Sequence, residues 1–474
     1  MTKTDIKEAL EKIVKELRES EGWGKDDSKV NKKTESQMCI RLSKAISKEY
    51  IRRGDGGLYL FTGKRYIFLG ENDTDMFLAE VVRRLDWGSV YLVGSITIFR
   101  KYLLNDMGVK EFEPKLRFLS FENCVLDLDT GDVLEFSPSW ESRIELDFEY
   151  HKEAKAERWE KFLYEVIDDG ASIRVLQEFL GLVFIDKEML SIETALYLFG
   201  YGSNGKSVVY DIIKTILGKN CSSFDLFQLC THQNSDYYTA EANGKLLNFC
   251  SDMGDKDFSG GRYKQISARE PITVRPIGRA PFEARDMPLL AASINKMPTT
   301  SDSSDGYWRR SKIIVFPKTF TEEQQDKELK KKLREEISGI FNWIMEGRER
   351  ILSQKGKFTN SNVMLENVKK ARIDSDSVLG WMFNEGYYTL KNVPQSEEWL
   401  EEQHLTSIFY QSYCEYCQEN GNKPKNRPNF VQGLKQAGAE TIPKMREGDK
   451  VSSGVRLLKL KDKNYIEGEE ELPF

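Results

Sequence analysis

The most informative stretch of the sequence is Gly200-Tyr201-Gly202-Ser203-Asn204-Gly205-Lys206-Ser207. The apolar run from Ala195 to Phe199 precedes it and predicts a buried strand, and the pattern from Val208 to Leu217 predicts a helix. A glycine-rich loop that ends in Lys-Ser between a strand and a helix is typical of the P-loop that cradles nucleotide phosphates. The alternative is a glycine-rich turn without a ligand, and the order of strand, loop and helix favours the P-loop.

The residue types in this loop suit phosphate binding. Glycines let backbone N–H groups turn inward around phosphate oxygens, and the N-terminus of a helix adds partial positive charge. Lys206 would reach the outer phosphates, and the Ser207 hydroxyl would bind Mg²⁺. We expect ATP and Mg²⁺ as cofactors, with the nucleotide held by Gly200, Gly202, Ser203, Asn204, Gly205, Lys206, Ser207 and Val208.

Composition excludes several other classes of protein. The net charge of −6 argues against a basic nucleic-acid coat, so any DNA contact must come from local basic patches. No apolar run approaches the ~18 residues of a membrane span, and residues 1–20 lack a signal-peptide core, so the cytoplasm is the expected location. Only Cys414 and Cys417 have metal-like spacing, and without a second pair we expect two apolar thiols on a helix rather than a zinc site.

Polar residues follow two further predicted strands. The run from Lys245 to Asp252 ends in an acid, which a Walker B site uses to hold Mg²⁺ or to polarise the attacking water. The run from Pro288 to Asn295 ends in an amide that could orient a water against the γ-phosphate, although Asn is also a common turn residue. Arg309 and Arg310 precede a strand, and either could serve as an arginine finger on the nucleotide of a neighbouring subunit.

The segment from Arg262 to Arg285 is rich in basic residues. It holds six of them (Arg262, Lys264, Arg269, Arg275, Arg279, Arg285) against two acids (Glu270, Glu283), with apolar residues interleaved. We predict a basic hairpin that contacts DNA phosphates through Lys264, Arg275 and Arg279. A solvated surface hairpin is the alternative.

The N-terminal part predicts a small α+β region. Ile6, Leu10, Ile13, Val14 and Leu17 fall on one helical face, and the runs 58–69 and 118–136 predict β-hairpins. Asp127 and Asp129 share one face of a predicted strand, as do the metal-binding carboxylates of some primases and polymerases. We prefer a strand that runs into a turn, where Asp is favoured.

The ordered set of motifs resembles superfamily 3 helicases, and more narrowly the motor of phage, plasmid and poxvirus primase–helicases. The resemblance is carried by the stretch Gly200–Ser207, a strand followed by Ser251-Asp252, the basic hairpin, Ala291–Asn295 and Asp305–Arg310. It implies that Lys206 and Ser207 are the Walker A pair, Asp252 the Walker B acid, Asn295 the sensor, and Arg309 or Arg310 the finger. The family often has a second acid where this chain has Met253, and Gly-Gly-Asp where it has Ala268-Arg269-Glu270.

The C-terminal part is locally basic. Between Gly421 and Lys463 there are eleven basic residues and four acids, which with the predicted helices and strands suggests a winged-helix DNA-binding domain. A helical lid with a charged face is the alternative. The end, Glu469 to Phe474, offers acids and an aromatic anchor that could bind replication proteins, or it is an ordinary frayed terminus.

The expected fold is α/β, with an AAA+-like P-loop NTPase core, an N-terminal α+β domain and a C-terminal winged-helix-like domain. The predicted segments are an N-terminal helix and linker (1–34), the α+β domain (35–150), a helical collar or linker (151–189), the motor (190–352), a linker (353–372), the winged-helix-like domain (373–465) and an acidic tail (466–474).

The predicted function is an ATP-dependent, ring-forming DNA helicase that replicates a phage, virus or mobile element. The resemblance implies a homo-hexamer and 3′-to-5′ movement. We expect single-stranded DNA in the central channel and, because no primase module is recognised in the sequence, a separate primase. One alternative is a primase–helicase with a metal site at Asp127 and Asp129. The others are an ATP-dependent initiator or loader that does not unwind DNA, and a small-molecule kinase, which leaves the basic segments unexplained.

Overall fold

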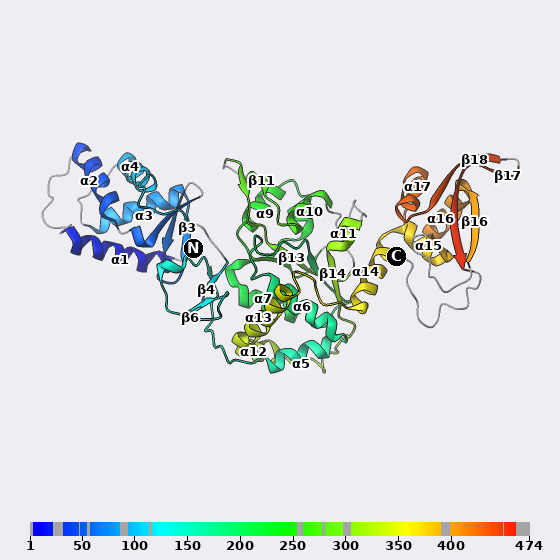
Figure 1. Ribbon diagram of the computed structural model, residues 1–474, viewed down its shortest axis with the longest axis horizontal. Coiled ribbons are helices and arrows are strands. Elements are labelled where there is room, and N and C mark those ends of the chain that lie inside the picture. Colours follow the sequence, from blue (N-terminus) through cyan, green and yellow to red (C-terminus); the bar gives the residue numbers. More distant parts are fainter. Residues whose placement is uncertain are drawn as a thin grey trace. The chain divides into compact units, whose positions relative to one another are not determined.

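The computed structural model describes residues 3–21, 32–46, 48–54, 57–85, 93–112, 116–253, 258, 260–276, 280–296, 305–389, 399–448 and 450–460. The chain divides into two compact units (Figure 1), Met1–Ala154 with Phe184–Asp186, and Lys155–Val183 with Lys187–Phe474. Within the described ranges, no helix has the length and apolar character needed to cross a membrane.

The first unit combines helices with small sheets. Its helices are α1 (Lys3–Glu21), α2 (Lys32–Ala45), α3 (Glu71–Arg84) and α4 (Val93–Leu104). One antiparallel sheet contains β1 (Ile51–Gly54), β2 (Gly57–Phe61) and β3 (Tyr66–Leu69), and a second sheet contains β4 (Phe118–Ser120), β5 (Val125–Asp127), β6 (Val133–Leu134) and β7 (Ile144–Glu145). Leu10, Ile13 and Leu17 of α1 are buried against Leu78 and Val81 of α3, which confirms the amphipathic N-terminal helix.

The two predicted hairpins of this unit have different outcomes. Residues 58–69 form the antiparallel pair β2–β3, as predicted. Residues 118–136 contain three strands rather than two, because β5 pairs with both β4 and β6. A turn around Gly131, whose φ is 73°, joins β5 to β6.

The second unit is built on a five-stranded parallel sheet with the order β14-β8-β13-β10-β9. Its strands are β8 (Ala195–Phe199), β9 (Cys221–Ser222), β10 (Leu247–Cys250), β13 (Leu289–Ile294) and β14 (Ser311–Val315). All residues of β10 and β13 are buried, as expected for parallel strands covered on both faces. The α/β class with a parallel sheet is therefore confirmed.

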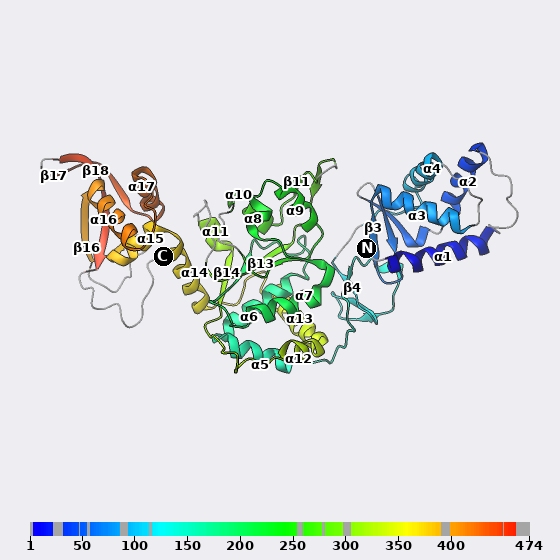
Figure 2. The ribbon, with the colours of Figure 1, turned by 180° about the vertical axis from the view of Figure 1, so that it is seen from behind.

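Helices cover both faces of this sheet (Figures 1 and 2). One face carries α8 (Leu226–Cys230), α9 (Ser235–Ala242), α10 (Gly260–Ser267) and α11 (Asp305–Arg310). The other carries α5 (Glu157–Val166), α6 (Gly170–Leu182), α7 (Lys206–Leu217), α12 (Leu329–Glu335) and α13 (Ile337–Ser353). Helices α5 and α6 are separated near Asp169, whose carboxylate caps α6 by accepting from the N–H groups of Ala171 and Ser172.

The prediction that residues 262–285 form one hairpin is wrong for residues 262–267. Gly260–Ser267 is helix α10, because Tyr263 and Ile266, three residues apart, bury one helical face in the core. The hairpin itself is shorter and consists of β11 (Ile272–Val274) paired with β12 (Phe282–Ala284).

The C-terminal part of this unit has its own core. Helix α14 (Asn362–Ser375) leads into α15 (Ser377–Glu385), β15 (Tyr387–Tyr388), β16 (Trp399–Leu405), α16 (Thr406–Glu419), α17 (Arg427–Gln436), β17 (Glu440–Glu447) and β18 (Lys450–Leu460). Strand β18 pairs with β15, β16 and β17. The core is rich in aromatic residues and also contains Cys417, which lies one helical turn from Cys414 on α16. No metal-binding cluster occurs among the described residues.

Candidate functional site

Three strand ends meet at one edge of the parallel sheet. Strand β13 lies between β8 and β10, and the pairs Ile294–Phe199 and Cys250–Ala292 align the carboxyl ends of the three strands. The glycine-rich loop follows β8, Asn295 follows β13, and Asp252 follows β10. The structure therefore brings three of the predicted nucleotide-site elements to the same edge of the sheet.

The glycine-rich loop needs its glycines for space and for backbone conformation. A Cβ on Gly200 would lie 2.0 Å from Asn204 Nδ2 and 2.7 Å from the Phe316 carbonyl oxygen. Gly202 and Gly205 have φ values of 105° and 94°, in the left-handed region that glycine adopts without strain. Gly205 also occupies the N-cap of α7, so the first turn of this helix receives no side-chain cap.

Lys206 is the buried cation at the centre of the site. Its Nζ donates to the Gly200 carbonyl, to Asn204 Oδ1 at 3.2 Å and to Asn295 Oδ1 at 3.2 Å. The side chain is buried, and burial lowers the pKa of Lys206 below its ordinary value, while the carboxylate of Asp252 acts in the opposite direction. Lys206, Asn204 and Asn295 are thus in contact, and Asp252 is near enough to act on the lysine electrostatically.

Asn204 joins the loop to the strand on its other side. It is 3% exposed, and its Nδ2 donates to the Phe316 carbonyl at 3.4 Å while its Oδ1 accepts from Lys206. The Ser203 carbonyl accepts from the Phe320 N–H at 2.9 Å. The segment after β14 therefore supports the loop, a contact that local sequence patterns do not reveal.

The remaining predicted residues of this edge are exposed or partly exposed. Ser207 lies in the first turn of α7 with its side chain exposed, and Val208 is partly buried beside it. Asp252 is exposed, whereas Met253 is buried in the core and its N–H donates to the Ser293 carbonyl at 3.2 Å. Position 253, where the family often has a second acid, therefore faces the core.

The two candidate arginines lie at the opposite edge of the sheet. Ser311 of β14 aligns with Ala195 of β8, so Arg309 and Arg310 lie at the amino ends of these two parallel strands. The glycine-rich loop lies at the carboxyl end of β8. With β8 five residues long and a rise of about 3.3 Å per residue, the two edges are roughly 15 Å apart. Neither arginine contacts Lys206 or Asp252 of its own chain.

The predicted DNA-binding residues do not form one group. Lys264 lies on α10, where its side chain passes close to Gly306 of α11: a Cβ on Gly306 would be 3.2 Å from Lys264 Cε. Arg275 is exposed at the end of β11, and Arg279 lies outside the described residues. Arg262 binds Asp236 at 3.0 Å, and the buried Arg269 donates to the Leu190 carbonyl at 3.1 Å, so these two basic residues serve internal contacts.

The paired carboxylates of the first unit have a structural partner. The Arg117 guanidinium contacts Asp127 through two hydrogen bonds, at 3.0 and 2.7 Å, and lies 3.3 Å from Asp129. Asp127 also accepts from the Asp129 N–H at 3.0 Å, and the Arg117 side chain lowers the pKa of Asp127. This arrangement supports the strand-and-turn interpretation over a metal site.

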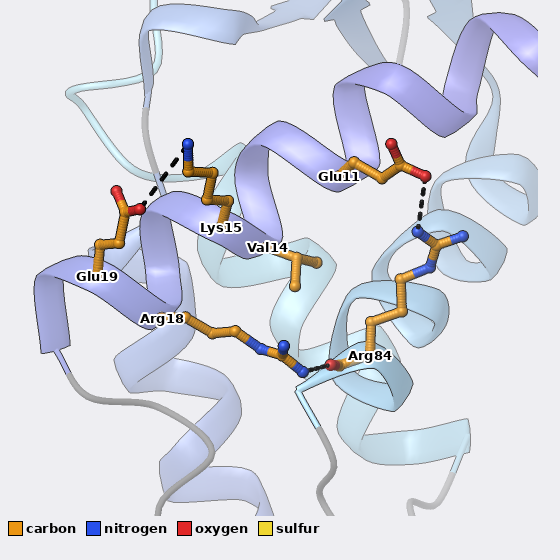
Figure 3. Close-up of a pocket in the computed structure, with 6 residues that line it drawn as sticks. All are labelled: Glu11, Val14, Lys15, Arg18, Glu19 and Arg84. Carbon is orange, nitrogen blue, oxygen red and sulfur yellow. Dashed lines mark hydrogen bonds and ion pairs between the residues drawn. The ribbon is translucent and has the colours of Figure 1, made fainter.

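A pocket of about 540 Å³ lies elsewhere, between α1 and the end of α3 (Figure 3). Its charged residues interact with one another: Glu11 with Arg84 at 3.7 Å and Lys15 with Glu19 at 3.9 Å, while Arg18 donates to the Arg84 carbonyl at 2.6 Å. None of the predicted site residues lines this pocket, so its volume does not identify the candidate site.

Sequence reasoning missed Glu193, which forms ion pairs with both candidate arginines. Its carboxylate contacts Arg309 Nη2 at 2.9 Å and Arg310 Nη2. An acid before a strand carries no distinctive pattern, and its partners are 116 and 117 positions further along the chain, so no local signal could have found this contact.

Comparisons with known proteins agree with these observations. Residues 95–168 match the family model described as D5 N terminal like, and residues 198–310, which contain all the predicted site residues, match a family of unknown function, DUF5906. The chain is 27% identical over 237 residues to "Putative helicase L207/L206" of Acanthamoeba polyphaga mimivirus, a match that covers 45% of this chain and 23% of that protein.

Solved structures whose backbones match that of this chain include two apo structures of the NrS-1 C terminal region. Their TM-scores are 0.47 and 0.44, at 12% and 13% identity, and they cover 85% and 86% of this chain and 93% and 95% of theirs. The matches to the D5 family model and to the viral protein confirm that the chain resembles the phage and viral primase–helicase type of superfamily 3.

Proposed function

We propose that this chain is an ATP-dependent, ring-forming DNA helicase that serves the replication of a phage, virus or mobile element. The observation that supports it most is the meeting of Lys206, Asn295 and Asp252 at one edge of a parallel sheet, with Arg309 at the opposite edge. This is the arrangement needed if each nucleotide is shared between two chains.

The residues present fit a nucleotide with Mg²⁺. Lys206 is a buried cation whose hydrogen bonds go to neutral oxygens, and the first turn of α7 has no side-chain cap. A Cβ on Gly202 would meet open space, so the loop leaves room for a phosphate beside its backbone there. Lys206 would exchange its hydrogen bonds to the Gly200 carbonyl and to Asn295 for hydrogen bonds to phosphate oxygens. Ser207 and Asp252 would hold Mg²⁺. When bound, Mg²⁺ would offset the negative charge of the phosphates. Asn295, once released by Lys206, would orient the attacking water.

Two surfaces are proposed to contact DNA. One is the β11–β12 hairpin, through Arg275 and Arg279, whose grip on phosphates would be independent of base sequence. The other is a winged-helix-like fold over residues 373–465, with β17 and β18 as the wing. In this region Lys425, Arg456 and Lys459 pair with acids at 3.0, 2.9 and 3.8 Å. The exposed basic residues are Lys423, Arg427, Lys435, Lys444, Arg446 and Lys450.

The remaining parts of the proposal concern assembly and partners. The resemblance favours a homo-hexamer. The acidic tail, residues 466–474, lies outside the described residues, and we propose it as a contact for replication proteins. Removal of Leu472–Phe474 should then weaken binding to such proteins and leave ATP hydrolysis intact.

Unwinding of a forked duplex tests the proposed function directly. The wild-type protein with ATP and Mg²⁺ should separate the strands, and Lys206→Ala should not, because the buried cation for the phosphates is lost. Lys214→Ala is a matched control, since Lys214 lies on the same helix with its Nζ bonded to Tyr210 and Ser223. ATP-dependent rings that never unwind DNA would favour a loader instead.

A further inference from the structure

Glu193 and the two arginines form a small cluster at the edge of the sheet that precedes the strands. Glu193 lies just before β8, and both arginines end α11. The Glu193 carboxylate accepts a hydrogen bond from Arg309 at 2.9 Å and forms an ion pair with Arg310, so a single acid faces two guanidinium groups. The cluster therefore has an excess of positive charge.

The two arginines are held differently. Arg310 is buried, at 7% exposed, and donates in addition to the Gly306 carbonyl at 2.5 Å, so it is fixed within its own chain. The Arg309 side chain is 68% exposed, and Glu193 is its hydrogen-bond partner in the described structure. Arg309 is thus the arginine that can leave its position without opening the core.

A carboxylate and a phosphate offer a guanidinium similar pairs of oxygen atoms. An exposed ion pair is weak and exchanges readily with a competing anion. The Glu193 carboxylate therefore occupies Arg309 in the way that a phosphate of a neighbouring chain's nucleotide would.

We propose that Glu193 is a positioning residue that holds Arg309 within its own chain until a neighbouring chain's ATP displaces it. Arg310 anchors Glu193 and α11 and does not move. The proposal rests on the proposed function, because it requires nucleotide bound between chains. It also assigns the finger to Arg309, a choice that the sequence leaves open.

ATP-driven assembly of the full chain tests this proposal. The fraction of assembled protein is measured by mass photometry over a range of ATP concentrations for the wild type and Glu193→Gln. Loss of the exposed pair should lower the ATP concentration at half-assembly by roughly two- to fivefold. Glu401→Gln is the matched control, because Glu401 is a half-exposed acid that forms an ion pair with Arg456 at 2.9 Å in the C-terminal part. It should assemble as the wild type does.

A second comparison separates positioning from a general structural role. Glu193→Gln is combined with Arg309→Ala and with Arg309→Lys, the second of which keeps a positive charge and so keeps assembly measurable. The gain in assembly should vanish with alanine and shrink with lysine. Any fall in the Tm of the nucleotide-free protein, caused by loss of the charged partner of the buried Arg310, should be of similar size whichever residue stands at position 309. An unchanged gain in both backgrounds, or a Glu193→Gln variant that needs as much ATP as the wild type or more, overturns the proposal. A wild type that does not assemble with ATP overturns the proposed function as well.

Discussion

A side chain at position 200 would occupy the space that Asn204 fills. We expect Gly200→Ala to displace Asn204 and, through it, Lys206, because the added Cβ would lie 2.0 Å from Asn204 Nδ2. The cost should be about 1–3 kcal/mol of unfolding free energy, with at least a tenfold loss of ATP affinity in a fluorescent-nucleotide titration. Gly261→Ala is the control, since a Cβ there meets open space on a helix and should be neutral or slightly stabilising. Equal ATP affinity in both variants would contradict this role of Gly200.

The charge of Lys206 gives a second prediction at the same scale. Burial lowers the pKa of Lys206 and the Asp252 carboxylate raises it, so Asp252→Asn should lower that pKa further. A lysine with a lower pKa loses its proton at a lower pH, and the alkaline loss of ATP binding should therefore move to lower pH in the variant. ATP binding is measured without Mg²⁺, so that the loss of a metal ligand in Asp252→Asn does not affect the measured affinity. A shift to higher pH would refute the electrostatic contact between the two residues.

At the scale of single elements, the proposed function requires the β11–β12 hairpin to contact DNA. Arg275→Ala should weaken single-stranded DNA binding several-fold and reduce the salt dependence by about one counterion, with ATP hydrolysis in the absence of DNA unchanged. Arg285→Ala is the comparison, because this exposed arginine already pairs with Glu283 at 2.8 Å. If the two variants bind DNA alike, the hairpin is an ordinary surface hairpin.

The elements also show what local patterns can and cannot predict. The strands before Gly200, Asp252 and Asn295 were predictable because each is an apolar run that ends in residues suited to a strand end. Helix α10 was missed because its buried positions, Tyr263 and Ile266, lie in a segment where basic and apolar residues alternate closely enough to imitate a strand. The contacts Asn204–Phe316 and Glu193–Arg309 join residues more than a hundred positions apart, and no periodicity encodes them.

At the scale of the whole molecule, the two edges of the parallel sheet suggest how chains would assemble. One edge carries Lys206 and Asp252, and the other carries Arg309. When the first edge of one chain faces the second edge of the next, the contact is heterologous, and repeated contacts of this kind form a ring when the rotation between neighbouring chains closes on itself. The nucleotide would then be bound by both chains, and its hydrolysis would change how they contact each other.

Mixing two inactive variants tests most directly the claim that each nucleotide is shared between two chains. Lys206→Ala and Arg309→Ala should each hydrolyse ATP very slowly on their own, since each lacks one half of every shared site. In an equal mixture, random assembly places an intact Lys206 opposite an intact Arg309 at about a quarter of the interfaces, and ATP hydrolysis should recover to about that fraction of the wild-type rate. The account is contradicted if Arg309→Ala is fully active alone, or if mixed rings form and no activity returns.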